Sequence, residues 1–149
     1  MNLRFFVPLL TVLAATSCTA KEPAMNTAQI IDHMQDLATK NLGLKPIACV
    51  EVDQRSQPEV RCYTSTTSAE QFAEQVGELE HFRNTTGWRD DYGVLSATLR
   101  YGQNPQGIVV IFERPNGSWQ VFPSTKPLAE AQAKGATGYV TIIVNETDD

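Results

Sequence analysis

The sequence has few of the residues that most catalytic sites need. Only two histidines, His33 and His81, occur in 149 residues, and both fall in predicted helices with polar neighbours. A nucleophilic serine or cysteine needs a base beside it, and a zinc site needs three or four converging ligands. The sequence also lacks a Gly-x-Ser-x-Gly turn and a glycine-rich phosphate loop with its lysine. We therefore expect no catalytic residue, no metal and no cofactor.

Basic residues are scarce as well, and no apolar run is long enough to stay in a membrane. The chain has 12 Lys and Arg residues against 17 Asp and Glu residues, for a formal net charge of −5. Without a basic stripe it has no electrostatic footprint for nucleic acid. The apolar run at residues 5–15 has about 11 residues, whereas a bilayer core needs about 20. We expect neither a nucleic-acid partner nor a permanent spanning helix.

The N-terminal segment has the order of an export signal. Arg4 precedes the apolar run at residues 5–15, and small residues follow as far as Cys18. A charged, then apolar, then small-residue order is typical of such signals. One interpretation is a general secretory signal that is cleaved near Ser17 or Ala20, which would leave Cys18 as an ordinary residue.

The residues "AATSC" that end at Cys18 favour another interpretation, because they resemble the lipobox of bacterial lipoprotein precursors. The resemblance implies that residues 1–17 are a signal peptide and that Cys18 becomes the acylated N-terminus. Residues 18–25 would then be a short lipidated tether. Two or three acyl chains anchor a protein stably, whereas one chain binds only marginally. Because Thr19 and not Asp follows the cysteine, the resemblance also implies an outer-membrane protein that faces the periplasm.

The cysteine count is odd, which agrees with lipidation. If Cys18 is acylated, Cys49 and Cys62 remain as a pair, and an exported protein meets an oxidising compartment. A disulfide between them would close a loop of about 14 residues and stabilise the fold by roughly 3 kcal/mol. The alternative is two reduced, buried thiols in a cytosolic protein.

Two segments have the apolar spacing of amphipathic helices. The first covers residues 26–42, where Asn26 and Gln29 match a capping box, and the second begins at Ser68 with Gln71 in the matching position. The second helix also carries four glutamates, at positions 70, 74, 78 and 80. They could bind a cation, but no loop with calcium-site spacing accompanies them. We interpret them as a solvated helix face.

The remaining segments predict a sheet. Strands are predicted at residues 47–53, 59–66, 94–101, 108–114, 118–122 and 139–145, and a short helix at 127–134. If Cys49 faces Cys62 directly, paired positions in the first hairpin sum to 111. Residues 26–149 are therefore predicted to form a single α+β domain, with a mainly antiparallel sheet of five to six strands and two or three helices packed on one face.

The segment at residues 82–93 has the composition of a contact surface. It concentrates residue types that are enriched at binding hot spots, namely Trp88, Arg89, Asp90, Asp91 and Tyr92. We predict that these five residues bind a partner. In the alternative interpretation Trp88 and Tyr92 cover the core, and Arg89 pairs with Asp90 or Asp91.

Three functions agree with these observations. The leading hypothesis is a non-catalytic, membrane-anchored binding module with a protein partner in the cell envelope, either an inhibitor or immunity protein or an accessory of envelope assembly. The second is a hydrolase of envelope glycan or lipid that uses carboxylates near Trp88–Tyr92. However, Asp90 and Asp91 are adjacent, and adjacent residues of a strand point to opposite faces. The third is a purely structural envelope protein.

Overall fold

The computed structural model of the chain describes residues 24–50, 59–115 and 125–145. The predicted signal, Cys18 and the predicted strand at 118–122 lie outside these residues. The elements in chain order are α1 (Thr27–Lys40), β1 (Lys45–Ile47), β2 (Val60–Ser65), α2 (Ala69–Gly77), β3 (Phe82–Asn84), β4 (Arg89–Asp91), β5 (Val94–Tyr101), β6 (Gly107–Glu113), α3 (Lys126–Ala133) and β7 (Gly138–Asn145).

Both predicted capping boxes are confirmed. The Asn26 side chain accepts a hydrogen bond from the Gln29 amide at 2.9 Å, and the Gln29 side chain accepts one from the Asn26 amide at 3.0 Å. Ser68 and Gln71 make the same pair of bonds at the start of α2. Each box satisfies two amides that have no partner within the helix.

No helix in the described ranges is long and apolar enough to cross a bilayer.

The seven strands within the described residues form one antiparallel sheet. Its order is β1-β2-β7-β6-β5-β3, and β4 also pairs with β5. The α+β class is therefore confirmed. The sheet is larger than the five to six strands predicted, because β3 and β4 arise within a segment that reads as a connection in the sequence. Phe82 pairs with Tyr101 and Asp91 pairs with Val94, so the edge of the sheet consists of two short strands.

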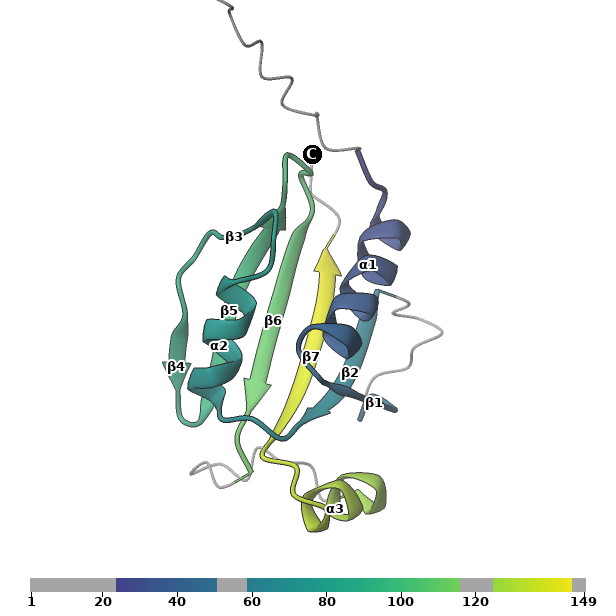
Figure 1. Ribbon diagram of the computed structural model, residues 1–149, viewed down its shortest axis with the longest axis vertical. Coiled ribbons are helices and arrows are strands. Elements are labelled where there is room, and N and C mark those ends of the chain that lie inside the picture. The colour runs from purple at the N-terminus through teal and green to yellow at the C-terminus, as the bar shows by residue number, and fades with distance from the viewer. Residues whose placement is uncertain (1–23, 51–58, 116–124, 146–149) are drawn as a thin grey trace, which may run out of the picture.

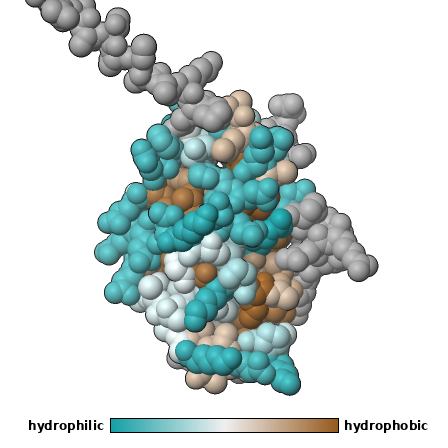
Figure 2. Space-filling model, turned by 45° about the vertical axis from the view of Figure 1, so that its right-hand side comes forward, coloured by the Kyte–Doolittle hydropathy of each residue, from teal (hydrophilic) through white to brown (hydrophobic). Residues whose placement is uncertain are grey.

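Helices α1 and α2 cover one face of the sheet (Figure 1). Their apolar stripes and the inward side chains of the strands form the main core, whose largest fully buried members are Tyr63, Phe72, Phe112, Ile30 and Met34. On the face drawn in Figure 2, hydrophobic side chains show only as small, separate patches among hydrophilic ones. The helices thus bury their apolar stripes against the sheet.

Helix α3 departs from the prediction that the helices pack on one face. Its buried residue Leu128 belongs to a second, smaller cluster with Val60, Cys62 and Tyr139. These strand residues alternate with core residues such as Tyr63 and Val140, so their side chains lie on the opposite face of the sheet. The prediction of one helical layer is correct for α1 and α2 and wrong for α3.

The Cys49–Cys62 disulfide is confirmed, but the predicted hairpin register is wrong. Ile47, not Cys49, lies opposite Cys62, and the bond joins Cys49 to Cys62 with a Cα–Cα distance of 5.1 Å. The shift is two residues, so each side chain keeps its predicted face. Strand β1 also begins earlier, because an edge strand tolerates Pro46, which has no amide to donate.

Candidate functional site

The domain has two distinct ends along the strand direction, and the described chain begins at one of them. The Met25 amide donates to Asn104 Oδ1 at 2.8 Å, and Asn104 Nδ2 donates to the Tyr101 carbonyl at 3.1 Å. Asn104 is buried and follows the end of β5. Strand β7 also ends here (Figure 1). We call this end the N-terminal pole.

The opposite end, which we call the cleft pole, holds a cavity that lies between α2, the end of β6 and the residues before β7. Strand β6 ends there, and α2 and β7 begin there (Figure 1). The cleft has a volume of about 630 Å³ and we call it the pole cleft. Small or apolar residues form much of its lining, and Glu70 and Arg114 supply its charges; the small or apolar residues are Ala69, Gly93, Pro115 and Ala136.

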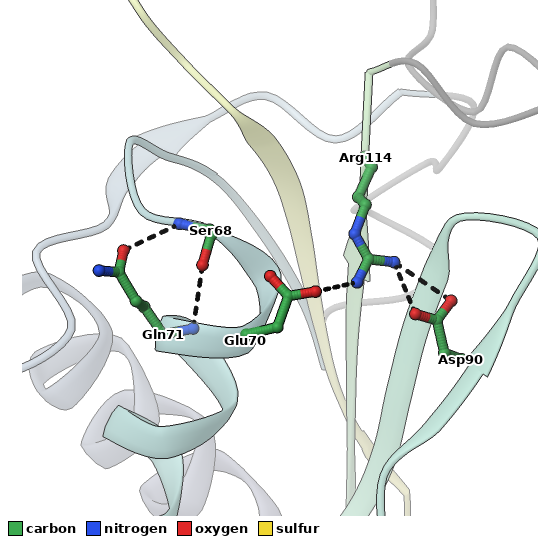
Figure 3. Close-up of polar contacts among 5 residues, drawn as sticks. All are labelled: Ser68, Glu70, Gln71, Asp90 and Arg114. Carbon is green, nitrogen blue, oxygen red and sulfur yellow. Dashed lines mark hydrogen bonds and ion pairs between the residues drawn. The ribbon is translucent and has the colours of Figure 1, made fainter.

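Arg114 links three elements at this pole (Figure 3). Its Nη2 donates to Glu70 Oε1 of α2 at 2.8 Å, and its Nη1 lies 3.0 Å from Asp90 Oδ2 and 3.2 Å from Asp90 Oδ1 in β4. Arg114 itself directly follows β6. Such charge-assisted bonds are shorter and stronger than neutral ones. The Arg114 side chain is 27% exposed, so water screens the cluster only in part.

The protonation states of this cluster follow from its contacts. A hydrogen bond from its own backbone amide lowers the pKa of Glu70, and hydrogen bonds from Arg114 and Ser68 lower it further. Partial burial lowers the pKa of Arg114, but the bonds and charges of Glu70 and Asp90 outweigh it and raise that pKa. Glu70 is therefore an anion and Arg114 a cation at neutral pH. Two carboxylates around one guanidinium leave a net charge of −1.

The β4–β5 hairpin distributes the predicted binding residues over different sides of the sheet. Asp90 lies opposite Leu95, whose side chain is in the core, so Asp90 is on the α2 side, where it binds Arg114. Arg89 and Asp91 are the neighbours of Asp90 in β4, and their side chains lie on the other face of the sheet. Asp90 therefore lies beside the pole cleft, bound to the lining residue Arg114, and is separated from Arg89 and Asp91.

The two aromatic residues of the predicted surface also have different environments. Trp88 is half-buried and packs on the core, with its ring edge-on to Phe72 at a centroid distance of 6.1 Å. Tyr92 is 66% exposed and lies in the hairpin turn beside Gly93. Both turn residues have positive φ angles, 51° for Tyr92 and 90° for Gly93, as tight hairpins require. A side chain at such a φ is unfavourable by about 1–2 kcal/mol, so Tyr92 is an exposed aromatic residue in a strained position.

Two residues of this site have no local signal in the sequence. Glu70 reads as one of several glutamates on a solvated helix face, and Arg114 reads as the end of a strand. They meet only in the fold, because Arg114 is 44 residues from Glu70 and 24 from Asp90. A periodicity pattern covers one element at a time and does not report such a contact.

Both histidines lie away from the pole cleft. Their rings contact the ring of Tyr101 near the N-terminal pole, with centroid distances of 5.0 Å for His33 and 6.1 Å for His81. His33 also stacks on Phe82, so it closes the gap between α1 and the edge of the sheet. In the three described ranges, no three His, Cys, Asp or Glu side chains converge as metal ligands would.

Comparison with models of protein families, with curated proteins and with solved structures gives no match to this chain.

Proposed function

We propose that the protein is a membrane-anchored, periplasm-facing lipoprotein of the bacterial outer membrane, and that it acts as a non-catalytic binding module of the inhibitor, immunity or envelope-assembly type. In this proposal Cys18 carries the acyl chains and the pole cleft contacts a protein partner. One observation carries the proposal. The described chain begins at the N-terminal pole, where Met25 is bound to Asn104, and the pole cleft lies at the far end of the sheet.

The chain length sets how far the cleft extends from the membrane. The seven Cα-to-Cα steps from Cys18 to Met25 span at most about 25 Å. Strand β5 has eight residues and runs between the poles, which adds about 25 Å. The cleft would then lie within about 50 Å of the bilayer surface and face away from it. Such a tether raises the effective concentration of the module near partners in the same layer.

The chemistry of the pole cleft supports binding more than hydrolysis. A glycoside hydrolase needs one carboxyl group with a raised pKa as its general acid. At the cleft the pKa of Glu70 is lowered, and both Glu70 and Asp90 are held by Arg114. Burial raises the pKa of Glu113, but Glu113 lies opposite Tyr139 on the other face of the sheet. The cleft carboxylate Glu70 is suited to holding a ligand, not to donating a proton.

The proposal is tested by capture of partners from envelope extract. We expect the wild type to retain one or more envelope proteins that are lost with Tyr92→Asn and with Arg114→Gln. Asn tolerates a positive φ, so Tyr92→Asn removes the ring and keeps the turn. Arg100→Gln, an exposed arginine near the opposite end of β5, serves as the control. Equal partner sets for all four proteins would contradict the proposed surface.

The anchor is tested separately by mass spectrometry of the protein purified from its native organism. We expect a chain that begins at Cys18 and carries two or three acyl groups. An unmodified chain that is cleaved elsewhere would contradict lipidation, and the secretory-signal interpretation would replace it.

A further inference from the structure

The charge balance of the pole cleft favours a cationic ligand. Arg114 is already bound to two carboxylates, so a third anion would meet a net negative charge. A cation would meet Glu70 in the lining and, on the other side of Arg114, Asp90; their side chains are 72% and 53% exposed. Each carboxylate has about four lone-pair sites and can accept further hydrogen bonds. Arg114 holds both acids in place, so they do not have to be ordered when a ligand arrives.

The shape of the cleft favours a long side chain over a small ion. Much of its lining is small or apolar, with Ala69, Gly93, Pro115 and Ala136 around the two charged residues. Lysine and arginine bury an apolar stem and keep a charged head in polar surroundings. Their stems match the small residues, and their head groups would reach the carboxylates. A bare metal ion would leave most of the 630 Å³ unfilled.

Helix α2 continues the negative charge away from the cleft. Glu74 and Glu78 follow Glu70 at four-residue spacing, so the three lie on the same side of the helix. Like charges at this spacing destabilise a helix. Glu78 is the C-cap, where a negative charge opposes the helix dipole, and the last turn has no basic residue. A basic chain along α2 would relieve these repulsions.

We infer that the pole cleft accepts a lysine or arginine side chain from a basic segment of a partner protein, and that the segment continues along α2 beside Glu74 and Glu78. This inference rests on the proposed function and names the chemistry of its partner. The occupant is a protein segment because cleft and helix together offer an extended negative surface beside the exposed ring of Tyr92. Tyrosine is enriched at protein interfaces.

The test uses the acylated full-length mature chain in nanodiscs of zwitterionic lipid. The probes are fluorescent heptapeptides of alternating alanine and lysine, or alanine and glutamate, with blocked ends, and anisotropy reports their binding. We expect the lysine peptide to bind and the glutamate peptide not to bind. Glu70→Gln should weaken binding about threefold, as for a partly exposed ion pair, and adding Asp90→Asn should bring the loss to about tenfold. The control Asp32→Asn removes an exposed charge on α1 and should leave binding unchanged.

Three outcomes would overturn the inference. Equal losses for Asp32→Asn and Glu70→Gln would mean that only net charge matters. Preference for the glutamate peptide would reverse the charge argument. Complete displacement of the lysine peptide by millimolar calcium would indicate a metal-ion site. Urea midpoints of all variants show whether a loss of binding is caused by a loss of folding. The single variant Asp90→Asn shows how much of the loss in the double variant is due to Asp90.

Failure of this inference is distinguishable from failure of the proposed function. If Arg114→Gln abolishes capture of envelope partners but the lysine peptide does not bind, the binding module stands and the basic partner is wrong. If the peptide binds as expected but Arg114→Gln retains every partner, the cation preference of the cleft stands and its proposed role in the envelope is wrong.

Discussion

The close approach of Gly138 and Phe112 provides the sharpest test of the packing behind the site. Gly138 begins β7, and Phe112 lies two residues before Arg114. A Cβ atom at position 138 would come within 3.0 Å of three atoms of the Phe112 ring. Carbon atoms in contact prefer about 3.5–4.0 Å. The ring therefore lies on the bare backbone of β7, and Gly138→Ala would force one of them to move.

The size of the effect follows from the surroundings of the ring. Phe112 is fully buried, and the ring of Phe72, also fully buried, lies 5.2 Å away, so the ring has no free space to enter. Overpacking of this kind is unfavourable by about 1–3 kcal/mol, and we expect the upper part of that range. Gly138 does not have a positive φ. Alanine there would therefore also restrict the unfolded chain, which raises the free energy of unfolding by about 0.4–1 kcal/mol and offsets part of the loss. The net loss in the free energy of unfolding should be about 2 kcal/mol.

Urea unfolding of the wild type and four variants, namely Gly138→Ala, Gly77→Ala, Phe112→Leu and the double variant, measures this prediction. Gly77→Ala is the matched control, because Gly77 is the last residue of α2 and its added Cβ would have nothing within 4 Å. It should stabilise the domain by about 0.4–1 kcal/mol. Phe112→Leu combined with Gly138→Ala should be more stable than the sum of the single effects predicts, with a coupling of about 1 kcal/mol or more. A Gly138→Ala protein as stable as the wild type, or strict additivity, would refute the reasoning.

Three further predictions concern stability. Replacing Cys49 and Cys62 by alanine should lower the free energy of unfolding by about 3 kcal/mol, and a loss below about 1 kcal/mol in urea unfolding would contradict the loop-entropy argument. Asn26→Ala removes the confirmed N-cap of α1 and should lower the free energy of unfolding by about 1 kcal/mol. An unchanged urea midpoint would show that the cap contributes nothing. Burial raises the pKa of Glu113, so the folded state binds its proton more tightly than the unfolded state, and stability falls as the pH rises above the ordinary carboxyl pKa. Glu113→Gln should therefore stabilise the domain at pH 7 and not at pH 3, and equal effects at both pH values would contradict this.

The sequence predicts the local features of this fold well. Both capping boxes depend on side chains three residues apart, and both are present in the structure. The predicted strand at 94–101 matches β5 at both ends, because alternation over eight residues is a strong signal. The predicted last strand begins one residue late, since Gly138 offers no side chain to read as part of a pattern.

Features that depend on distant contacts are not predictable in this way. The short strands β3 and β4 exist because β5 supplies their partners, and three residues have no periodicity of their own. The hairpin register shifts by two residues, since a cysteine pair fixes proximity but not direct opposition. The contact of Arg114 with Glu70 and Asp90 joins three elements, and only the order of strands in the sheet brings them together.

The predicted contact surface is divided by the same long-range geometry. Tyr92 is exposed and Asp90 lies beside the pole cleft, while Trp88 packs against Phe72 in the core. Composition identifies the residue types of an interface but not the direction in which each side chain points. Trp88→Ala would therefore change stability as well as binding, and Tyr92→Asn is the cleaner probe.

Photocrosslinking in living cells tests the central claim most directly, because it asks which pole of the domain contacts a partner. A photoreactive phenylalanine derivative would replace Tyr92 at the cleft pole or Gln103 near the N-terminal pole. We predict that illumination gives a discrete adduct with another envelope protein from position 92, and that Arg114→Gln weakens it. Adducts from position 103 alone, or none from position 92, would contradict the account.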